Sequence, residues 1–168
     1  MKKSFNIKIE IDEDDVACLI SNAMADNCGF EWWECDDEKK YAEAKSELIS
    51  ERKPDADDQI CFEDIWARVL LKGGKLNLLE AESDWHWSGH KPGEMLWAAQ
   101  IRAEGCEPVG GTWHKVGIED IVRGIQLYAE SHCANACGTS LQRIVEDGDF
   151  YDADAVFQFA AYGEVMFG

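Results

Sequence analysis

The order of apolar and polar positions predicts a chain of helices joined to a few short strands. Apolar and polar residues alternate from Phe5 to Ile11, which predicts a strand near 4–11 with one buried face. Asp12 follows as the predicted N-cap of a helix. The next apolar residues fall three or four positions apart and form one stripe of that helix: Val16, Leu19, Ile20, Ala23 and Met24.

The same helical spacing recurs along the rest of the chain. We expect a second helix over 37–51 and a third that begins near Phe62 and ends at Gly73-Gly74. Further helices are expected near 94–103, directly after Val116, in part of 133–146, and from about Asp152 onward.

Two more strands are predicted, over 75–82 and 112–116, and they can pair as the arms of a hairpin. The segment between them, about 83–111, has a weaker pattern and is expected to leave the hairpin as an inserted excursion. Long excursions in compact domains often carry function. Residues 27–35 are expected to form a loop. The predicted fold is therefore α+β, with a small antiparallel sheet packed by five or six helices.

The composition indicates one globular domain over 1–168. Apolar residues make up 46% of the chain, and seven Trp, seven Phe and four Tyr are more than disordered acidic chains carry. No apolar run approaches the roughly 18 residues of a membrane span. No apolar segment follows Lys2 and Lys3, as it would in a secretory signal. We therefore expect no membrane contact and a cytoplasmic location.

The net charge of the chain limits the classes of partner that it is expected to bind. The chain carries 34 acidic and 16 basic residues, a net charge of −18 that is spread along its whole length. Such a chain repels nucleic acid and anionic membranes, and its dispersed Lys and Arg do not form a phosphate-binding cluster. Direct nucleic-acid binding is therefore not expected, and a basic protein surface is the expected partner.

Only some of the acidic residues have a local explanation, as helix-start carboxylates at 12–15 and 152–154. The others lie near Trp-rich segments, and Trp often anchors interfaces. Trp85 and Trp87 are the first candidates for exposed anchors, and the alternative is that they form a core lid over the hairpin. The predicted partner-binding residues are Trp85, Trp87, Asp36, Asp37, Glu38, Asp55, Asp57, Asp58, Glu80, Glu82 and Asp84.

Zinc is an alternative that the cysteine spacing does not favour. The seven cysteines are expected to be reduced and mostly buried. Cys133 and Cys137 lie beside His132, and Cys28 and Cys35 are seven positions apart, but neither pair has the spacing of a zinc motif.

Two further patterns are weak as metal sites. His86 and His90 would share one helical face, but the Gly and Pro close to them argue against a helix. A run of aspartates lacks the Gly that a calcium loop needs at its sixth position: Asp147, Asp149, Asp152 and Asp154. No known catalytic motif is present. We predict no catalytic residue, no bound metal and no cofactor.

Three parts of the chain form a recognisable set of motifs: IEIDEDDVACLISNAM with FEWWE, then LLKGGKLNLLEAE with WHKVGIEDIVRGIQLYAES, and the ending FYDADAVFQFAAYGEVMFG. In order and spacing they resemble a family of small acidic proteins encoded by phages and integrative mobile elements. The excursion at 83–111 is longer than the hairpin usual in that family. The resemblance implies a shared fold and the context of a mobile-element accessory protein, of the kind that opposes host defence.

Charge, tryptophans and this context together predict a non-enzymatic inhibitor from a phage or mobile element. It would act in the host cytoplasm as an anti-CRISPR or anti-restriction protein. By binding a basic defence nuclease, it would block the nucleic-acid site as a nucleic-acid mimic. Two alternatives stay open: a structural or adaptor phage protein without inhibitory activity, and a metal-dependent enzyme that uses Cys, His or Asp clusters.

Overall fold

Six helices and two small antiparallel sheets form the part of the chain that the computed structural model describes, which is residues 10–26, 29–52, 60–94, 96–131, 144 and 149–167. The larger sheet has the order β1 (Phe30–Cys35), β2 (Lys75–Glu80), β5 (Trp113–Gly117), and the smaller one pairs β3 (Trp85–Trp87) with β4 (Pro108–Gly110). The helices are α1 (Glu13–Asp26), α2 (Glu38–Arg52), α3 (Phe62–Leu71), α4 (Ala98–Glu104), α5 (Ile118–Glu130) and α8 (Phe150–Tyr162). The predicted α+β fold and single domain are confirmed.

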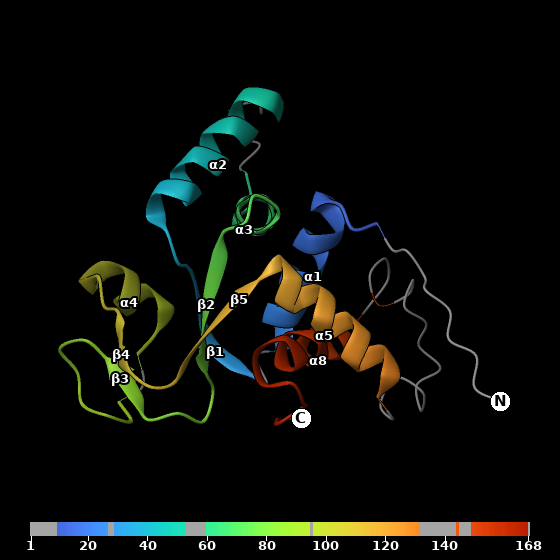
Figure 1. Ribbon diagram of the computed structural model, residues 1–168. Helices are drawn as coiled ribbons and strands as arrows, with labels where there is room; N and C mark the ends of the chain where they lie inside the picture. Colours follow the sequence, from blue (N-terminus) through green and yellow to red (C-terminus); the bar gives the residue numbers. More distant parts are fainter. Residues whose placement is uncertain are drawn as a thin grey trace.

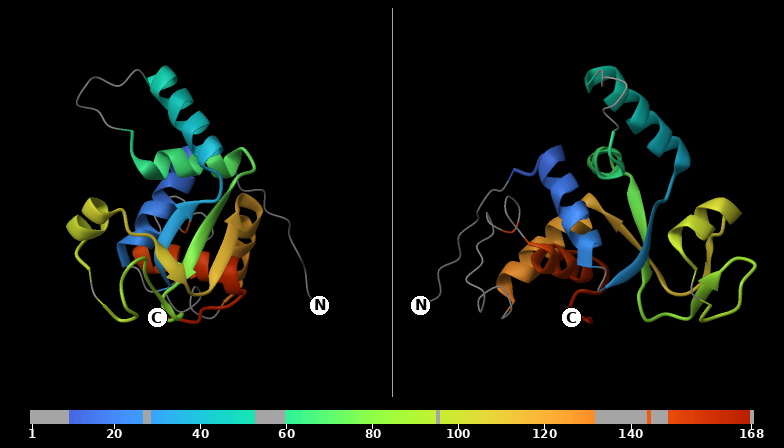
Figure 2. Two further views of the ribbon diagram at one scale, coloured as in Figure 1. Left: turned by 90° about the vertical axis from the view of Figure 1, so that its left-hand side faces the viewer. Right: turned by 180° about the vertical axis from the view of Figure 1, so that it is seen from behind.

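The larger sheet stands between a layer of helices and the excursion (Figures 1 and 2). Helices α1, α5 and α8 lie on one side of the sheet, and β3, β4 and α4 lie on the other. Helix α2 packs on α3 and extends away from the sheet. None of the described helices is long and apolar enough to cross a lipid bilayer.

The main core fills the space between the sheet and the helices. The stripe of α1 lies in it as the sequence predicts, with Val16, Leu19 and Ile20 at most 2% exposed. At the start of α1, the backbone N–H of Asp15 donates to Asp12 Oδ1 at 3.0 Å, and Asp12 N–H donates back to Asp15 Oδ2. Asp12 is therefore the N-cap that the sequence predicts.

The predicted hairpin is present, and the loop predicted at 27–35 is wrong for residues 30–35. Strands β2 and β5 pair antiparallel, with Leu76 opposite Val116. Residues Phe30–Cys35 form β1, which pairs antiparallel with the other side of β2. The register shifts between Phe30 and Trp32, as in a β-bulge. Because a bulge breaks the two-residue alternation of buried side chains, the strand pattern was hidden in the sequence.

Of the remaining expectations, the start of one helix is corrected, and two predicted segments fall largely outside the described residues. The predicted strand at 4–11 lies outside the described residues, except for Glu10 and Ile11, which are not in a strand. Helix α8 begins at Phe150 and is capped by Asp149, whose Oδ1 accepts the Asp152 N–H at 3.0 Å. Predicted helix segments within 133–146 fall outside the described residues, apart from the buried Ile144.

Asp152 lies in the first turn of α8, as the sequence predicts, but both Asp152 and Asp154 are buried in the core. Asp152 is 5% exposed and accepts a hydrogen bond from the Tyr128 hydroxyl of α5. Asp154, also 5% exposed, accepts the Gly29 N–H at 3.1 Å and a hydrogen bond from Gln158 Nε2 at 2.6 Å. These carboxylates hold elements together, since buried charged groups require partners.

Gln158 extends this network to the C-terminal segment. Its side chain is fully buried, and its Oε1 accepts the backbone N–H groups of Met166 and Phe167, both at 2.8 Å. Its Nε2 donates to the Phe167 carbonyl at 2.8 Å. The residues after α8 are therefore held against the helix by the side chain of Gln158.

We expect Gln158→Leu to lower the free energy of unfolding by about 3 kcal/mol or more, because it removes one hydrogen-bond donor to Asp154 and the acceptor of two backbone N–H groups. Urea denaturation followed by circular dichroism measures the change. The matched control is Gln126→Leu on the exposed face of α5, which should change stability little. Equal stability of the two variants would contradict the role given to the network.

Gly124 lies where the backbone of α8 packs closely against α5. A Cβ at this position would lie 2.3 Å from the Val156 carbonyl oxygen and 3.1 Å from the Ala160 backbone nitrogen. We expect Gly124→Ala to destabilise the protein by about 1–3 kcal/mol, despite the gain of about 1 kcal/mol in helix propensity. Thermal denaturation of this variant beside Gln126→Ala tests it, and an unchanged or raised melting temperature for Gly124→Ala would refute it.

Candidate functional site: an acidic tryptophan surface

Five of the seven tryptophans gather around one exposed carboxylate, Glu31. We name the set the tryptophan surface, and it consists of Trp32, Trp33, Trp66, Trp85, Trp87, Phe62 and Glu31. Glu31 lies at the bulge of β1, between Phe30 and Trp32, and has no partner in the register of β2. Bulges often redirect a side chain, and this one leaves the Glu31 side chain exposed.

One side of Glu31 borders a hollow of about 310 Å³. Its lining is Met24, Glu31, Trp32, Trp33, Phe62 and Trp66. Phe62 packs edge-on against Trp66, with ring centroids 4.9 Å apart, and remains 43% exposed. The hollow therefore combines aromatic walls with a single charged group, a carboxylate.

The other side of Glu31 borders a second hollow, of about 400 Å³, between the sheet and the excursion. Its lining is Glu31, Trp85, His86, Trp87, Gly93, Glu94 and Leu96. Trp87 packs edge-on against both Trp32 and Trp85, with 5.2 Å between ring centroids in each pair. Trp32 thus joins the two hollows into one surface.

This surface has the chemistry to bind a cationic side chain. Lys or Arg is attracted to the faces of aromatic rings, and a carboxylate at the rim strengthens that attraction. Glu31 forms no ion pair with any described residue, so its charge is available to a ligand. No nucleophile and base pair lines either hollow, within the residues that the structure describes.

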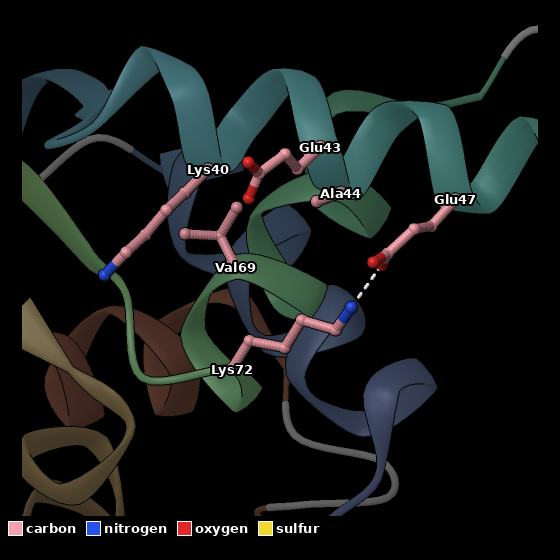
Figure 3. Close-up of a pocket in the computed structure, with 6 residues that line it drawn as sticks. All are labelled: Lys40, Glu43, Ala44, Glu47, Val69 and Lys72. Atoms are coloured by element: carbon pink, nitrogen blue, oxygen red, sulfur yellow. Dashed lines mark hydrogen bonds and ion pairs between the residues drawn. The ribbon is translucent and has the colours of Figure 1, made fainter.

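The groove between α2 and α3 differs in its charge balance (Figure 3). It encloses about 250 Å³ and is lined by Lys40, Glu43, Ala44, Glu47, Val69 and Lys72. Lys72 and Glu47 point toward one another and form an ion pair, and Lys40 Nζ donates to the Gly73 carbonyl at 3.4 Å. These charges compensate each other and hold α2 on α3, so the groove offers less to a charged ligand.

The two predicted anchors are placed differently from one another. Trp87 is 8% exposed, so it is not an exposed anchor, and its ring packs against Trp32 of β1 and against Trp85. Trp85 is half-buried and lines the second hollow. The sequence did not indicate Glu31, Trp32 and Phe62 as site residues, because the first two fall in the expected loop and Phe62 marks only the start of the third predicted helix.

The predicted acidic residues near α2 have structural partners. Asp36 Oδ1 accepts a hydrogen bond from Lys115 Nζ at 2.6 Å, and this contact lowers the pKa of the Asp36 carboxyl. Asp37 Oδ1 accepts the backbone N–H groups of Lys39 and Lys40, so it caps α2. Glu38 is exposed in the first turn of that helix.

The second predicted acidic group lies at the other end of β2. Glu80 Oε2 is 3.1 Å from His114 Nε2, whereas Glu82 and Asp84 are exposed in the turn before β3. The two acidic groups are separated by the length of β2, about 17 Å at 3.3 Å per residue. The structure does not bring them together. Asp55, Asp57 and Asp58 lie outside the described residues.

The residues considered as metal ligands from the sequence do not form the expected metal sites among the described residues. Asp149, Asp152 and Asp154 cap or brace α8 as described above, and Asp147 lies outside the described residues. His86 lies on β3 opposite Val109, so it shares no helical face with His90. The cysteine pairs proposed for zinc each include a residue that the structure does not describe.

None of the four described cysteines is fully buried. Cys18 and Cys61 are exposed, and Cys35 and Cys106 are partly buried. The expectation of mostly buried thiols is therefore wrong for this part of the chain. Burial raises the pKa of the Cys35 thiol.

We expect Trp87→Ala to release the excursion from the sheet, because the Trp32–Trp87 contact connects β3 to β1. Amide hydrogen exchange should become faster in β3 and β4, while the amides of β2 and α8 keep their protection. Trp97→Ala is the matched control, since Trp97 is 80% exposed. Unchanged exchange in β3 and β4 of the Trp87 variant would show that this contact does not hold the excursion.

No protein-family model, curated protein or solved structure matches the chain. The resemblance to small acidic phage and mobile-element proteins therefore stays a prediction. What the molecule binds has to be inferred from its own charge and from the tryptophan surface.

Proposed function

We propose that this protein is a non-enzymatic inhibitor, encoded by a phage or mobile element, that binds a host-defence nuclease and blocks its nucleic-acid site. The observation that supports the proposal is the tryptophan surface, where aromatic hollows flank the exposed Glu31. Its target would be a CRISPR effector or a restriction enzyme in the host cytoplasm, because such enzymes carry the basic channels that bind phosphates.

Charge and aromatic contact would contribute to different steps of binding. A net charge of −18 attracts a basic surface over a distance and speeds encounter. Lys and Arg side chains that otherwise contact phosphates can enter the hollows beside Trp32 and Phe62 and slow dissociation. The exposed Glu82 and Asp84 lie in the turn that leads into β3 and add negative charge near the second hollow.

The test is competition between this protein and nucleic acid for a purified effector. Fluorescence anisotropy of labelled DNA with a guide-loaded CRISPR effector, or with a restriction enzyme, measures DNA binding as the protein is added. We expect DNA to be displaced, and Glu31→Lys to raise the inhibitory concentration about tenfold or more, because it places a like charge against the basic surface.

Glu130→Lys is the matched control, since it changes the net charge equally on α5, on the helical side of the sheet. A second pair compares Phe62→Ala with Phe150→Ala, whose side chains are 43% and 40% exposed. Only the Phe62 change should weaken inhibition. Equal effects within both pairs would remove the tryptophan surface from the mechanism, and undiminished DNA binding at saturating protein across a panel of such effectors would reject the inhibitor.

A further inference from the structure

The excursion brings together three side chains of types that bind metals. His90 lies in the turn after β3, Glu104 ends α4, and Cys106 lies in the loop before β4. One ligand atom from each lies within 4.8 Å of the other two. His90 Nε2 is 3.0 Å from Glu104 Oε2, and the same oxygen is 3.8 Å from Cys106 Sγ.

These separations are close to those of donors around one zinc ion. Zinc binds nitrogen and oxygen at about 2.0–2.1 Å and sulfur at about 2.3 Å. Tetrahedral geometry with these bond lengths places neighbouring donors about 3.3–3.6 Å apart. Small side-chain movements would therefore bring all three donors to one ion. A set of one imidazole, one carboxylate and one thiolate suits zinc better than it suits calcium or magnesium, which prefer oxygen ligands.

Glu94 occupies the position of an outer partner for the histidine. Its Oε1 is 3.4 Å from His90 Nδ1, and its Oε2 accepts the backbone N–H of Lys91 at 3.2 Å. Metal-binding histidines commonly donate their second ring N–H to a carboxylate, which fixes the orientation of the ring. Here the carboxylate is itself held by the backbone, so Nε2 remains directed to Glu104 and Cys106.

The excursion is small enough that a cross-link would add substantially to its stability. Each arm of its hairpin is three residues long, α4 has seven residues, and Trp87 is the only described side chain of 83–111 that is buried. Segments this small seldom form a sufficient core by themselves, and many depend on a disulfide or a metal. An ion held by His90 and Cys106 would join the end of the hairpin arm to the end of α4, and its binding energy would stabilise the fold of the segment.

We propose that His90, Glu104 and Cys106 bind one zinc ion that cross-links the excursion, with Glu94 orienting the His90 ring. Cys106 binds as the thiolate and releases its proton on binding. A fourth coordination position is left for water. The proposal does not depend on the inhibitor function, because it concerns an ion bound by the isolated protein.

The experiment uses the full-length, reduced protein after removal of metals by a chelator. Zinc chloride is titrated by calorimetry, and cobalt chloride is titrated with absorption spectroscopy as a probe of the ligands. We expect one ion per chain, the visible bands of tetrahedral cobalt, and a thiolate-to-cobalt band in the near ultraviolet. Zinc should also slow amide exchange in β3, β4 and α4.

His90→Asn and Cys106→Ser should each weaken zinc binding about 100-fold or more, and Cys106→Ser should also remove the thiolate band. The matched controls are His86→Asn, within the excursion, and Cys61→Ser, an exposed cysteine outside it. Circular dichroism verifies that every variant is folded. Absence of zinc binding by the wild-type protein, or unchanged binding by both the His90 and Cys106 variants, would overturn the proposal.

Discussion

The position of β1 depends on two buried polar side chains of α8. Asp154 accepts the N–H of Gly29, the residue before the strand, and Gln158 donates to Asp154 while it holds the backbone after α8. A Cβ at residue 29 would lie 2.8 Å from Gln158 Cγ, so this approach requires glycine. Each buried polar group left without a partner costs about 1–3 kcal/mol, so the network favours a single placement of the strand. The bulge that exposes Glu31 follows two residues later. The geometry of the tryptophan surface is thus set by polar contacts on the helical side of the sheet.

The net charge is tolerated because the few basic residues are placed where they stabilise the fold. Arg68 joins α1, α2 and α3 by donating to Glu13 at 2.8 Å and contacting Glu51 at 2.8 Å. These hydrogen bonds raise the pKa of the Arg68 guanidinium and lower the pKa of the Glu51 carboxyl. Lys115 of β5 pairs with Asp36, which follows β1 on the other side of β2. Since these cations compensate carboxylates between elements, the tryptophan surface keeps its negative charge, which a basic partner can neutralise.

The sequence predicts those parts of the fold that depend on local periodicity. The stripe of α1, the Gly73-Gly74 turn and the pairing of β2 with β5 all follow from it. Strand β1 could not be predicted in this way, because its bulge places Phe30 and Trp33 on the buried side at odd spacing. The buried contacts of Asp152 and Asp154 could not be predicted either, because the sequence does not show which residues pack around an aspartate near the start of a helix. Tertiary contacts decide both cases.

The same limit explains why the candidate site was only partly recognised. Trp85 was identified from its irregular surroundings, but the residues that complete its surface come from β1 and α3 and meet it only in the folded chain. The second hollow lies between the sheet and the excursion, so it persists only while the excursion is held in place. The contact of Trp87 with Trp32 anchors one end, and the cluster around His90 can anchor the other. A surface fixed at both ends loses little conformational entropy when a partner binds, and a loosely attached excursion would bind more weakly with the same contacts.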